Sequence, residues 1–272
     1  MYNKYKIFMI IGDVFMYYCC AITDKGIRPH NEDALLIHRT VLTEGVTEQK
    51  LSNPFLIAVA DGVAGEQSGE IASSKCLEML KQVSFSSHVN IEKKLNNIHQ
   101  SLAKIGAKQK NTRNMQTTLC AMGIDEHDML YSINVGDSRL YRFRNAELLQ
   151  LSRDQSLVQV LFEEGIITQE ELQHHVYKNI IFPVLGNIDT KPEFDIKKYS
   201  EKIEYGDILL LCSDGLSDYA PKSEMEKILA MQIPMVRRLQ LLTELAMKHN
   251  CSDNITILAL TRIKDTRTLW RK

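Results

Sequence analysis

Four short acidic segments, far apart in the chain, most constrain how this sequence can fold. They are Asn31-Glu32-Asp33, Ala60-Asp61-Gly62, Ser213-Asp214-Gly215 and Ser252-Asp253-Asn254. Three of them border apolar, strand-like runs, and a carboxylate at the end of a buried strand is unfavourable unless a positive charge neutralises it. No matching set of Lys or Arg residues accompanies them. The pattern therefore predicts a fold that gathers these carboxylates around Mg²⁺ or Mn²⁺, since all-oxygen ligation favours these ions over zinc.

The composition is that of an ordinary globular protein and argues against some partners. Hydrophobic residues make up 44% of the 272 residues, and 33 basic residues balance 34 acidic ones for a net charge of −1. Without a basic excess, neither nucleic acid nor a membrane surface is an expected partner. The six cysteines have no CxxC spacing. They indicate reduced thiols in a cytoplasmic protein, not a disulfide framework or a zinc site.

The N-terminus has a composition that resembles a secretion signal. Two apolar stretches, 7–11 and 14–21, follow Lys4 and Lys6. However, Asp13 interrupts them, no small-residue cleavage site follows, and the run is short for a membrane span. We therefore expect a first core strand in a cytoplasmic protein without stable membrane insertion, with secretion as the alternative.

The periodicity of apolar residues predicts an α+β protein. Strand patterns cover 14–23, 33–39, 54–60, 118–124, 128–135, 138–143, 207–213 and 255–262. Helical patterns cover 66–82, 89–109, 155–164, 168–174, 222–231 and 234–249. Because strands come in hairpin-like series and helices in consecutive pairs, we predict antiparallel sheets covered by helices, not a doubly wound fold. The polar segment 41–53 is expected to be a surface loop, and 174–195 irregular.

Each acidic segment also has a purely structural interpretation. Asp61-Gly62 and Asp214-Gly215 could be turns after strands, the second with a helix N-cap. Asp253-Asn254 could be an Asx-turn that closes the preceding helix. Two strand-end Asp-Gly pairs make coincidence less plausible, and Gly62 would let the backbone turn sharply beside the Asp61 carboxylate.

The order of the motifs resembles one family, the metal-dependent Ser/Thr protein phosphatases (PPM, type 2C), in particular its bacterial members. The matching segments are 24–33 (DKGIRPHNED), 60–65 (ADGVAG), 117–119 (TTL), 134–141 (NVGDSRLY), 154–158 (DQSLV), 206–216 (GDILLLCSDGL) and 252–256 (SDNIT). The resemblance runs from about residue 18 to 262. It implies a single domain whose fold is a sandwich of two antiparallel sheets flanked on both sides by paired antiparallel helices.

The resemblance also assigns roles to individual residues. Asp61 corresponds to the carboxylate that bridges two metal ions, and the Gly62 carbonyl binds one of them. Asp214 and Asp253 correspond to ligands of the first ion, Glu32 and Asp33 to the second ion's surroundings, and Asp137 to a third, weaker site. Arg28 corresponds to the arginine that binds the substrate phosphate. A planar guanidinium can hold two phosphate oxygens, which suits this role.

Two stretches depart from the family pattern. After Asp61 the chain reads Gly62-Val63-Ala64-Gly65, so Val63 cannot donate a proton to a leaving group. Phe182-Pro183 replaces a more polar pair in a segment, 155–186, that we expect to form a flap over the substrate. The basic tail 263–272 is expected to be a loosely packed terminus.

The sequence thus predicts an enzyme that hydrolyses phosphoserine and phosphothreonine in proteins with a hydroxide between two Mn²⁺ or Mg²⁺ ions. Its substrates would be phosphorylated proteins, with a Ser/Thr kinase or its targets expected, and the enzyme would be a monomer. Two alternatives remain at this stage: a pseudophosphatase that binds phosphoproteins without turnover, and a structural module that binds no metal.

Overall fold

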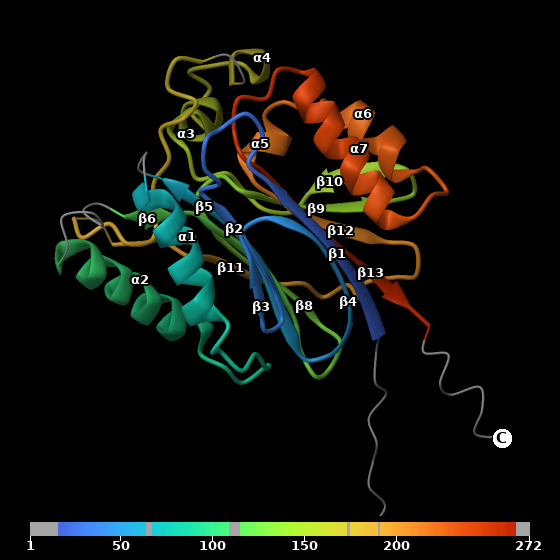
Figure 1. Ribbon diagram of the computed structural model, residues 1–272, viewed down its shortest axis with the longest axis horizontal. Coiled ribbons are helices and arrows are strands. Elements are labelled where there is room, and N and C mark those ends of the chain that lie inside the picture. The colour runs from blue at the N-terminus through green and yellow to red at the C-terminus, as the bar shows by residue number, and fades with distance from the viewer. Residues whose placement is uncertain (1–15, 64–66, 109–114, 173–174, 190, 265–272) are drawn as a thin grey trace, which may run out of the picture.

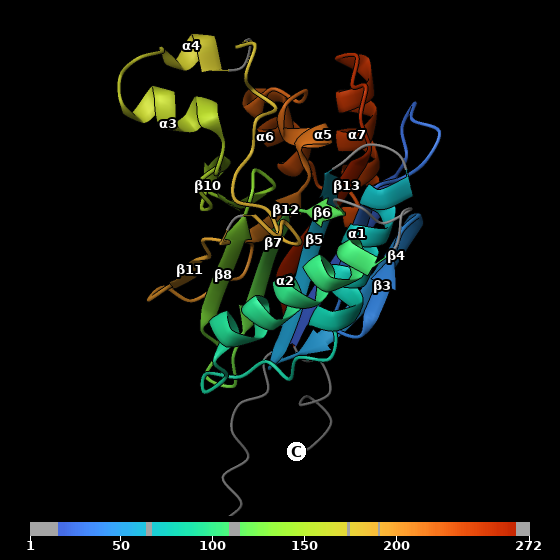
Figure 2. The ribbon, with the colours of Figure 1, turned by 90° about the vertical axis from the view of Figure 1, so that its left-hand side faces the viewer.

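Two antiparallel β-sheets are stacked face to face, with helices on both outer faces (Figures 1 and 2). The structure, a computed structural model, describes residues 16–63, 67–108, 115–172, 175–189 and 191–264. The first sheet has the order β10-β9-β12-β13-β1-β4. Its strands are β10 (Glu147–Gln150), β9 (Arg139–Arg144), β12 (Ile208–Cys212), β13 (Ile255–Ile263), β1 (Met16–Asp24) and β4 (Gly45–Ser52).

The second sheet has the order β11-β8-β7-β5-β2-β3, with β6 paired to β5. Its strands are β11 (Asp195–Lys198), β8 (Leu130–Val135), β7 (Leu119–Ile124), β5 (Phe55–Val63), β2 (Asp33–Ile37), β3 (Thr40–Leu42) and β6 (Gln116–Thr117). Two long helices, α1 (Gln67–Leu80) and α2 (Ile91–Lys108), cover its outer face (Figure 2).

The remaining helices lie on the first sheet and above one end of the sandwich. The outer face of the first sheet packs against α5 (Asp214–Ser217), α6 (Lys222–Leu229) and α7 (Met235–Lys248). Two short helices, α3 (Leu157–Glu163) and α4 (Gln169–Leu172), stand at the top of the molecule in Figure 1. The predicted pairing of helices on both faces is confirmed.

Strand β1 shows why the central strands read as continuous apolar runs. Tyr17, Cys19 and Ala21 pack between the two sheets. Cys20 and Ile22, which point to the other side, pack under the outer helices. Because successive side chains of a strand face opposite ways, a strand covered on both faces needs apolar residues at every position.

The prediction of a surface loop at 41–53 is wrong. Residues 45–52 form the strand β4, which pairs along β1 from Thr23↔Gly45 to Met16↔Ser52. This strand lies at the edge of its sheet and only Leu51 is buried. Its polar composition, including Glu48 and Lys50, suits an exposed edge strand and leaves too little alternation to predict it. The short strands β3, β6, β10 and β11 were not predicted either.

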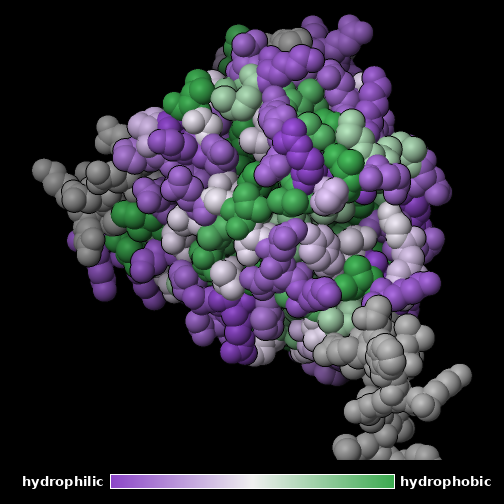
Figure 3. Space-filling model, turned by 45° about the vertical axis from the view of Figure 1, so that its right-hand side comes forward, coloured by the Kyte–Doolittle hydropathy of each residue, from purple (hydrophilic) through white to green (hydrophobic). Residues whose placement is uncertain are grey.

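The surface on the β4 and α7 side is mostly hydrophilic, with hydrophobic side chains gathered in a band across its centre (Figure 3). Among the helices in the described part of the chain, none is both long and apolar enough to cross a membrane. Residues 16–21 belong to β1, so the predicted first core strand is confirmed there. The apolar stretch 7–11 and most of the predicted basic tail 263–272 lie outside the described residues, which exclude 1–15 and 265–272.

Candidate metal centre and active site

The acidic segments meet at one end of the sandwich, where β1 ends and β13 begins. Asp33 opens β2 and lies directly across from Asp61 of β5. Asp24 at the end of β1 pairs with Ile255 at the start of β13, just after Asp253. Asp214 follows β12 and opens α5. Antiparallel pairing and sheet stacking therefore bring segments from both ends of the chain to one rim.

Asp33 connects the two sheets at this rim. It is 1% exposed, and its Oδ2 accepts a hydrogen bond of 2.7 Å from the Ser213 hydroxyl, which belongs to the other sheet's loop. The Ser213 Oγ in turn accepts a bond of 3.0 Å from the backbone N–H of Thr256. This chain of bonds fixes the Asp33 carboxylate relative to β12 and β13.

Asp61 is held by two threonines at the end of β5. Its N–H donates to Thr118 Oγ1 at 3.0 Å, and its carbonyl accepts from Thr117 Oγ1 at 2.8 Å and from the Thr118 N–H at 2.8 Å. The prediction of a sharp turn at Gly62 is wrong: β5 continues through Val63, where it pairs with β6. These bonds leave the Asp61 carboxylate free to face the rim.

Gly62 is required by close packing. A Cβ there would lie 2.2 Å from the carbonyl oxygen of Gly69, in the first turns of α1. A Cβ on Gly69 would in turn lie 2.8 Å from Glu32 Oε1. Both glycines therefore allow α1, β5 and Glu32 to approach one another, which places Glu32 beside Gly62.

The clustered carboxylates disfavour one another's ionisation. Burial, followed by Asp33, Asp214, Asp137 and Asp253, raises the pKa of Asp61 well above its usual value. Burial raises the pKa of Asp33 to about 6 and that of Asp137 to about 7. The pKa of Asp214 is likewise raised, first by burial and then by Asp137 and by Asp218. Removing one carboxylate or adding a cation would relieve this repulsion.

Arg28 lies at the rim beside Asp253. Its Nη2 lies 2.9 Å from Asp253 Oδ2, and its Nε donates to the Ser252 carbonyl at 2.8 Å. The Arg28 side chain is 46% exposed. Arg28 also acts on Glu32: burial raises the pKa of Glu32, and the Arg28 charge opposes that rise. The structure thus brings Asp253 to Arg28 and Glu32, which precede it by more than 200 residues in the sequence.

Asn254 organises the loop that carries Arg28 and Glu32, a role that the sequence analysis missed. Its Nδ2 donates to the carbonyls of Lys25 at 3.0 Å and His30 at 2.9 Å. Its Oδ1 accepts from the N–H of Glu32 at 2.8 Å. The position next to Asp253 was visible in the sequence, but partners more than 200 residues away were not.

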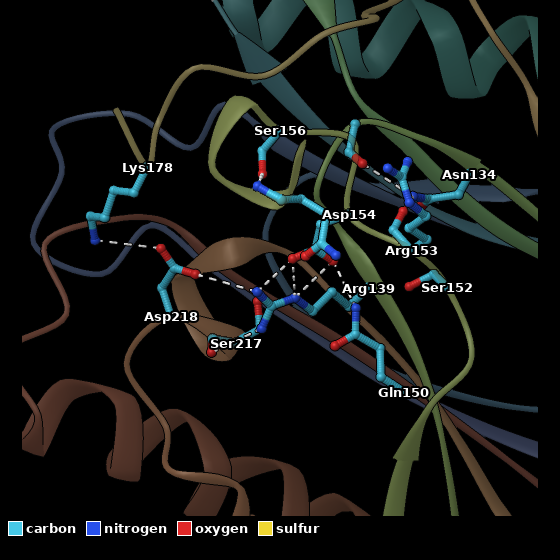
Figure 4. Close-up of polar contacts among 12 residues, drawn as sticks. Asn134, Arg139, Gln150, Ser152, Arg153, Asp154, Ser156, Lys178, Ser217 and Asp218 are labelled. Carbon is cyan, nitrogen blue, oxygen red and sulfur yellow. Dashed lines mark hydrogen bonds and ion pairs between the residues drawn. The ribbon is translucent and has the colours of Figure 1, made fainter. Parts of the chain in front are cut away.

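Asp218 is a second residue that the sequence analysis missed. It lies four residues after Asp214, which places both carboxylates on one side of a helical turn. Asp218 helps to raise the pKa of Asp214 and of Asp137. Arg139 lies between Asp218 and Asp154 and binds both Asp154 carboxylate oxygens, through Nε to Oδ1 at 3.0 Å and through Nη2 to Oδ2 at 2.6 Å (Figure 4). The spacing from Asp214 was the one available sequence signal.

Comparison with known proteins identifies the family. Residues 45–248 match the family model described as protein phosphatase 2C. The chain belongs to this family. A serine/threonine phosphatase of Listeria monocytogenes, stp, is 32% identical over 250 residues, which cover 88% of this chain and 94% of that protein.

Solved structures of serine/threonine phosphatases have the same fold as this chain. The S. agalactiae serine/threonine phosphatase has a TM-score of 0.77 and 27% identity, covering 90% of this chain and 99% of that chain. The catalytic domain of PstP, solved in complex with 2 manganese ions, has a TM-score of 0.72 and 28% identity, covering 92% and 100%. The predicted family, fold and phosphatase activity are thereby confirmed for this protein phosphatase 2C member.

The residues at the rim are suited to divalent cations that keep several bound waters, and not to an ion held by carboxylates alone. Within the described residues, no three Asp, Glu, His or Cys side chains are already spaced to hold one metal ion. Asp253 is engaged by Arg28, and Asp33 by Ser213. Mg²⁺ usually keeps several waters and needs only one or two carboxylates. Mutually repelling acids with raised pKa values, the donor set seen here, would be stabilised by such ions.

We predict that the stability of the Asp137→Asn variant, relative to wild type, increases as the pH rises. In metal-free folded protein, burial raises the pKa of Asp137 to about 7, from the value of 3.8 that applies to the unfolded chain. Its contribution to stability is therefore complete below pH 3.8 and is lost as the pH rises to about 7, because the unfolded chain releases this proton first. Relative to wild type, the variant should gain up to about 1.4 kcal/mol of unfolding free energy per pH unit in this range.

Urea unfolding in EDTA at pH 5 and pH 8 would measure this difference. Asp189→Asn is the matched control and should show no such trend, because Asp189 is exposed and is not among the charges that shift the pKa of Asp61, Asp137 or Asp214. A difference between Asp137→Asn and wild type that stays constant with pH would contradict the prediction.

Proposed function

We propose that this chain is a cytoplasmic Ser/Thr protein phosphatase that uses two Mn²⁺ or Mg²⁺ ions, with a third, weaker ion beside Asp137 and Asp214. The observation that carries the proposal is the convergence of Asp33, Asp61, Asp214 and Asp253 at one rim, where burial and mutual repulsion raise the pKa of three of them. Such a site is unfavourable unless cations complete it.

The proposed ligands of the first two ions come from four separate segments of the chain. Asp61, with the Gly62 carbonyl beside it, would lie between the two ions, because its carboxylate interacts with the acids on both sides. Asp214 and Asp253 would hold the first ion, and Glu32 and Asp33 the second. Two ions held by these residues would supply the positive charge that lowers the pKa of bound water, so that hydroxide would be available near neutral pH.

Arg28 is suited to bind the phosphate once a cation occupies Asp253. Its ion pair with Asp253 is largely exposed, and such pairs contribute at most about 1 kcal/mol. If Asp253 held a cation, the Arg28 guanidinium would be free to turn to a phosphate dianion, which can accept two parallel hydrogen bonds. Binding the phosphate in this way would orient the phosphorus relative to Asp61.

The substrates proposed are phosphorylated proteins, with a Ser/Thr kinase or its targets as partners. Nothing in the composition suits nucleic acid, and a monomer is proposed. The chain would act as one phosphatase domain with its core at 18–262, the flap at 155–186, and a short basic tail at 263–272. The flap, which carries α3 and α4, lies above the rim in Figure 1 and would shape substrate access.

We expect a phosphothreonine peptide to be hydrolysed with Mn²⁺ and not with EDTA. Because a ligand that binds only the folded state stabilises it, Mn²⁺ at a hundredfold excess over its dissociation constant should add about 2.7 kcal/mol of unfolding free energy. The measurements are phosphate release and thermal melting of one preparation, with and without metal. Potassium chloride at the same ionic strength is the control.

The outcomes separate the alternatives. Metal-dependent release supports the proposed enzyme. Metal-induced stabilisation without turnover of any phosphopeptide would instead favour a phosphoprotein-binding pseudophosphatase. If Mn²⁺ changes neither turnover nor melting, the proposed metal site is wrong.

A further inference from the structure

The flap has little apolar packing of its own. In its two helices, α3 and α4, Val158 is the one buried residue. The base of the flap is held by backbone bonds, from the Leu157 N–H to the Ile180 carbonyl at 2.8 Å and from the Phe182 N–H to the Gln155 carbonyl at 3.0 Å. A segment with so few buried contacts opens at low free-energy cost. Individual polar contacts can therefore decide its position.

Lys178 makes such a contact, from the flap to the segment that carries Asp214. Its Nζ lies 3.5 Å from Asp218 Oδ2 and 5.7 Å from the centroid of the Tyr219 ring. Figure 4 shows the Lys178 side chain extended toward Asp218 from a separate loop. An ammonium between a carboxylate and an aromatic face is held by both.

Asp218 is also part of the network below the rim. Its Oδ1 lies 3.9 Å from Arg139 Nη2, and Arg139 binds Asp154, the residue before the flap begins (Figure 4). Arg139 also donates to the Ser217 carbonyl at 3.3 Å. Asp154, just before the flap, and Lys178, within it, are thus both tied to the turn of chain that carries Asp218, four residues after Asp214.

We propose that Lys178 is a positioning residue, a latch that sets how far the flap closes over a bound phosphoprotein. The proposal rests on the phosphatase function proposed above. A peptide on either side of a phosphorylated residue must pass the flap, whereas a small aryl phosphate need only reach the rim. The latch should therefore affect KM for a phosphopeptide, and the ratio of peptide to aryl phosphate hydrolysis.

The contact is partly exposed, with Lys178 and Asp218 side chains 35% and 28% accessible. Exposed ion pairs and cation–π contacts are individually weak, so the latch opens readily and its effect is modest. We expect Lys178→Ala to raise KM for a phosphothreonine peptide roughly three- to fivefold with little change in kcat. Lys178→Arg keeps the charge and the aromatic contact and should restore most of the loss.

Two measurements test the latch, and one does not depend on activity. Amide hydrogen exchange of 157–181 in metal-free protein should be faster in Lys178→Ala than in wild type. Steady-state kinetics on a phosphothreonine peptide and on p-nitrophenyl phosphate give the change in the ratio. Lys191→Ala removes an exposed lysine for which the described residues show no ion pair, and it should match wild type in both measurements.

Unchanged exchange in Lys178→Ala would overturn the latch whatever the kinetics show. An equal loss on both substrates would also overturn it, because it would place Lys178 in the chemistry rather than in flap position. If no variant and no wild-type protein hydrolyses either substrate, the proposed function fails, while the exchange data still decide whether the contact holds the flap.

Discussion

Asp214→Asn is expected to lose about a thousandfold in kcat on a phosphothreonine peptide, roughly 4 kcal/mol of transition-state stabilisation. The carboxylate opens α5 at the rim, where it interacts with Asp137, Asp218 and Asp253. Asparagine keeps the shape and can still offer one oxygen, but it removes the charge that a divalent cation needs. Initial-rate measurements with saturating Mn²⁺ would show the loss.

The same substitution should make the metal-free protein more stable. Burial and four neighbouring aspartates raise the pKa of Asp214, so ionising it in the folded protein costs free energy at neutral pH. A neutral amide avoids that cost, and we expect a gain of about 2 kcal/mol in unfolding free energy in EDTA. The stabilisation by Mn²⁺ should shrink at the same time, because a ligand is missing.

Opposite changes in activity and stability are the signature of a residue kept for its function. Asp189→Asn, the exposed control, should change neither property. If Asp214→Asn lowers the stability of metal-free protein, the acidic rim is not under electrostatic strain. If it retains normal turnover with Mn²⁺, Asp214 is not a metal ligand.

The second large effect is expected at the opposite end of the sandwich, where Arg262 neutralises a buried aspartate. Asp128 is fully buried in the turn between β7 and β8. Its Oδ2 lies 3.0 Å from Arg262 Nη1, and its Oδ1 accepts a hydrogen bond from the Tyr17 hydroxyl. Tyr17 and Arg262 are opposite each other on β1 and β13. The group therefore joins the two sheets.

Arg262→Met should lower the unfolding free energy by about 3 to 5 kcal/mol, because it leaves the Asp128 charge buried without its partner. Urea unfolding measures this loss. Arg142→Met is the matched control, since Arg142 pairs with the exposed Glu201, and it should cost less than about 1 kcal/mol.

Adding Asp128→Asn to Arg262→Met should recover much of the loss. Asparagine tolerates the positive φ of 65° at this position and removes the unpaired charge. A double variant no more stable than Arg262→Met would show that Arg262 acts through packing rather than through charge. Turnover per folded molecule should stay near the wild-type value in all these variants, because the group is remote from the acidic rim.

The central strands could be predicted because their burial is complete. β1, β5, β12 and β13 are covered on both faces, so nearly every residue is apolar. Edge strands such as β4 could not, because one face and one edge meet water and their sequence is as polar as a loop. Long helices with one apolar face, α2 and α7, matched their predicted ranges to within a few residues.

The sequence by itself determined which carboxylates the fold brings to the rim, and it predicted their role in binding metal ions. Isolated carboxylates beside buried strands have few stable explanations, and their order along the chain is specific to one family. The tertiary structure alone decided which groups act on them. Asn254 and Ser213 hold Glu32 and Asp33 through bonds that span about 180 residues or more. Arg28 pairs with Asp253, and Lys178 reaches Asp218, only because sheet stacking and the flap bring distant segments together. The identity of an acidic residue and of its neighbours can be read from the sequence. Its partner in the folded protein depends on strand pairing that closes loops of a hundred residues or more.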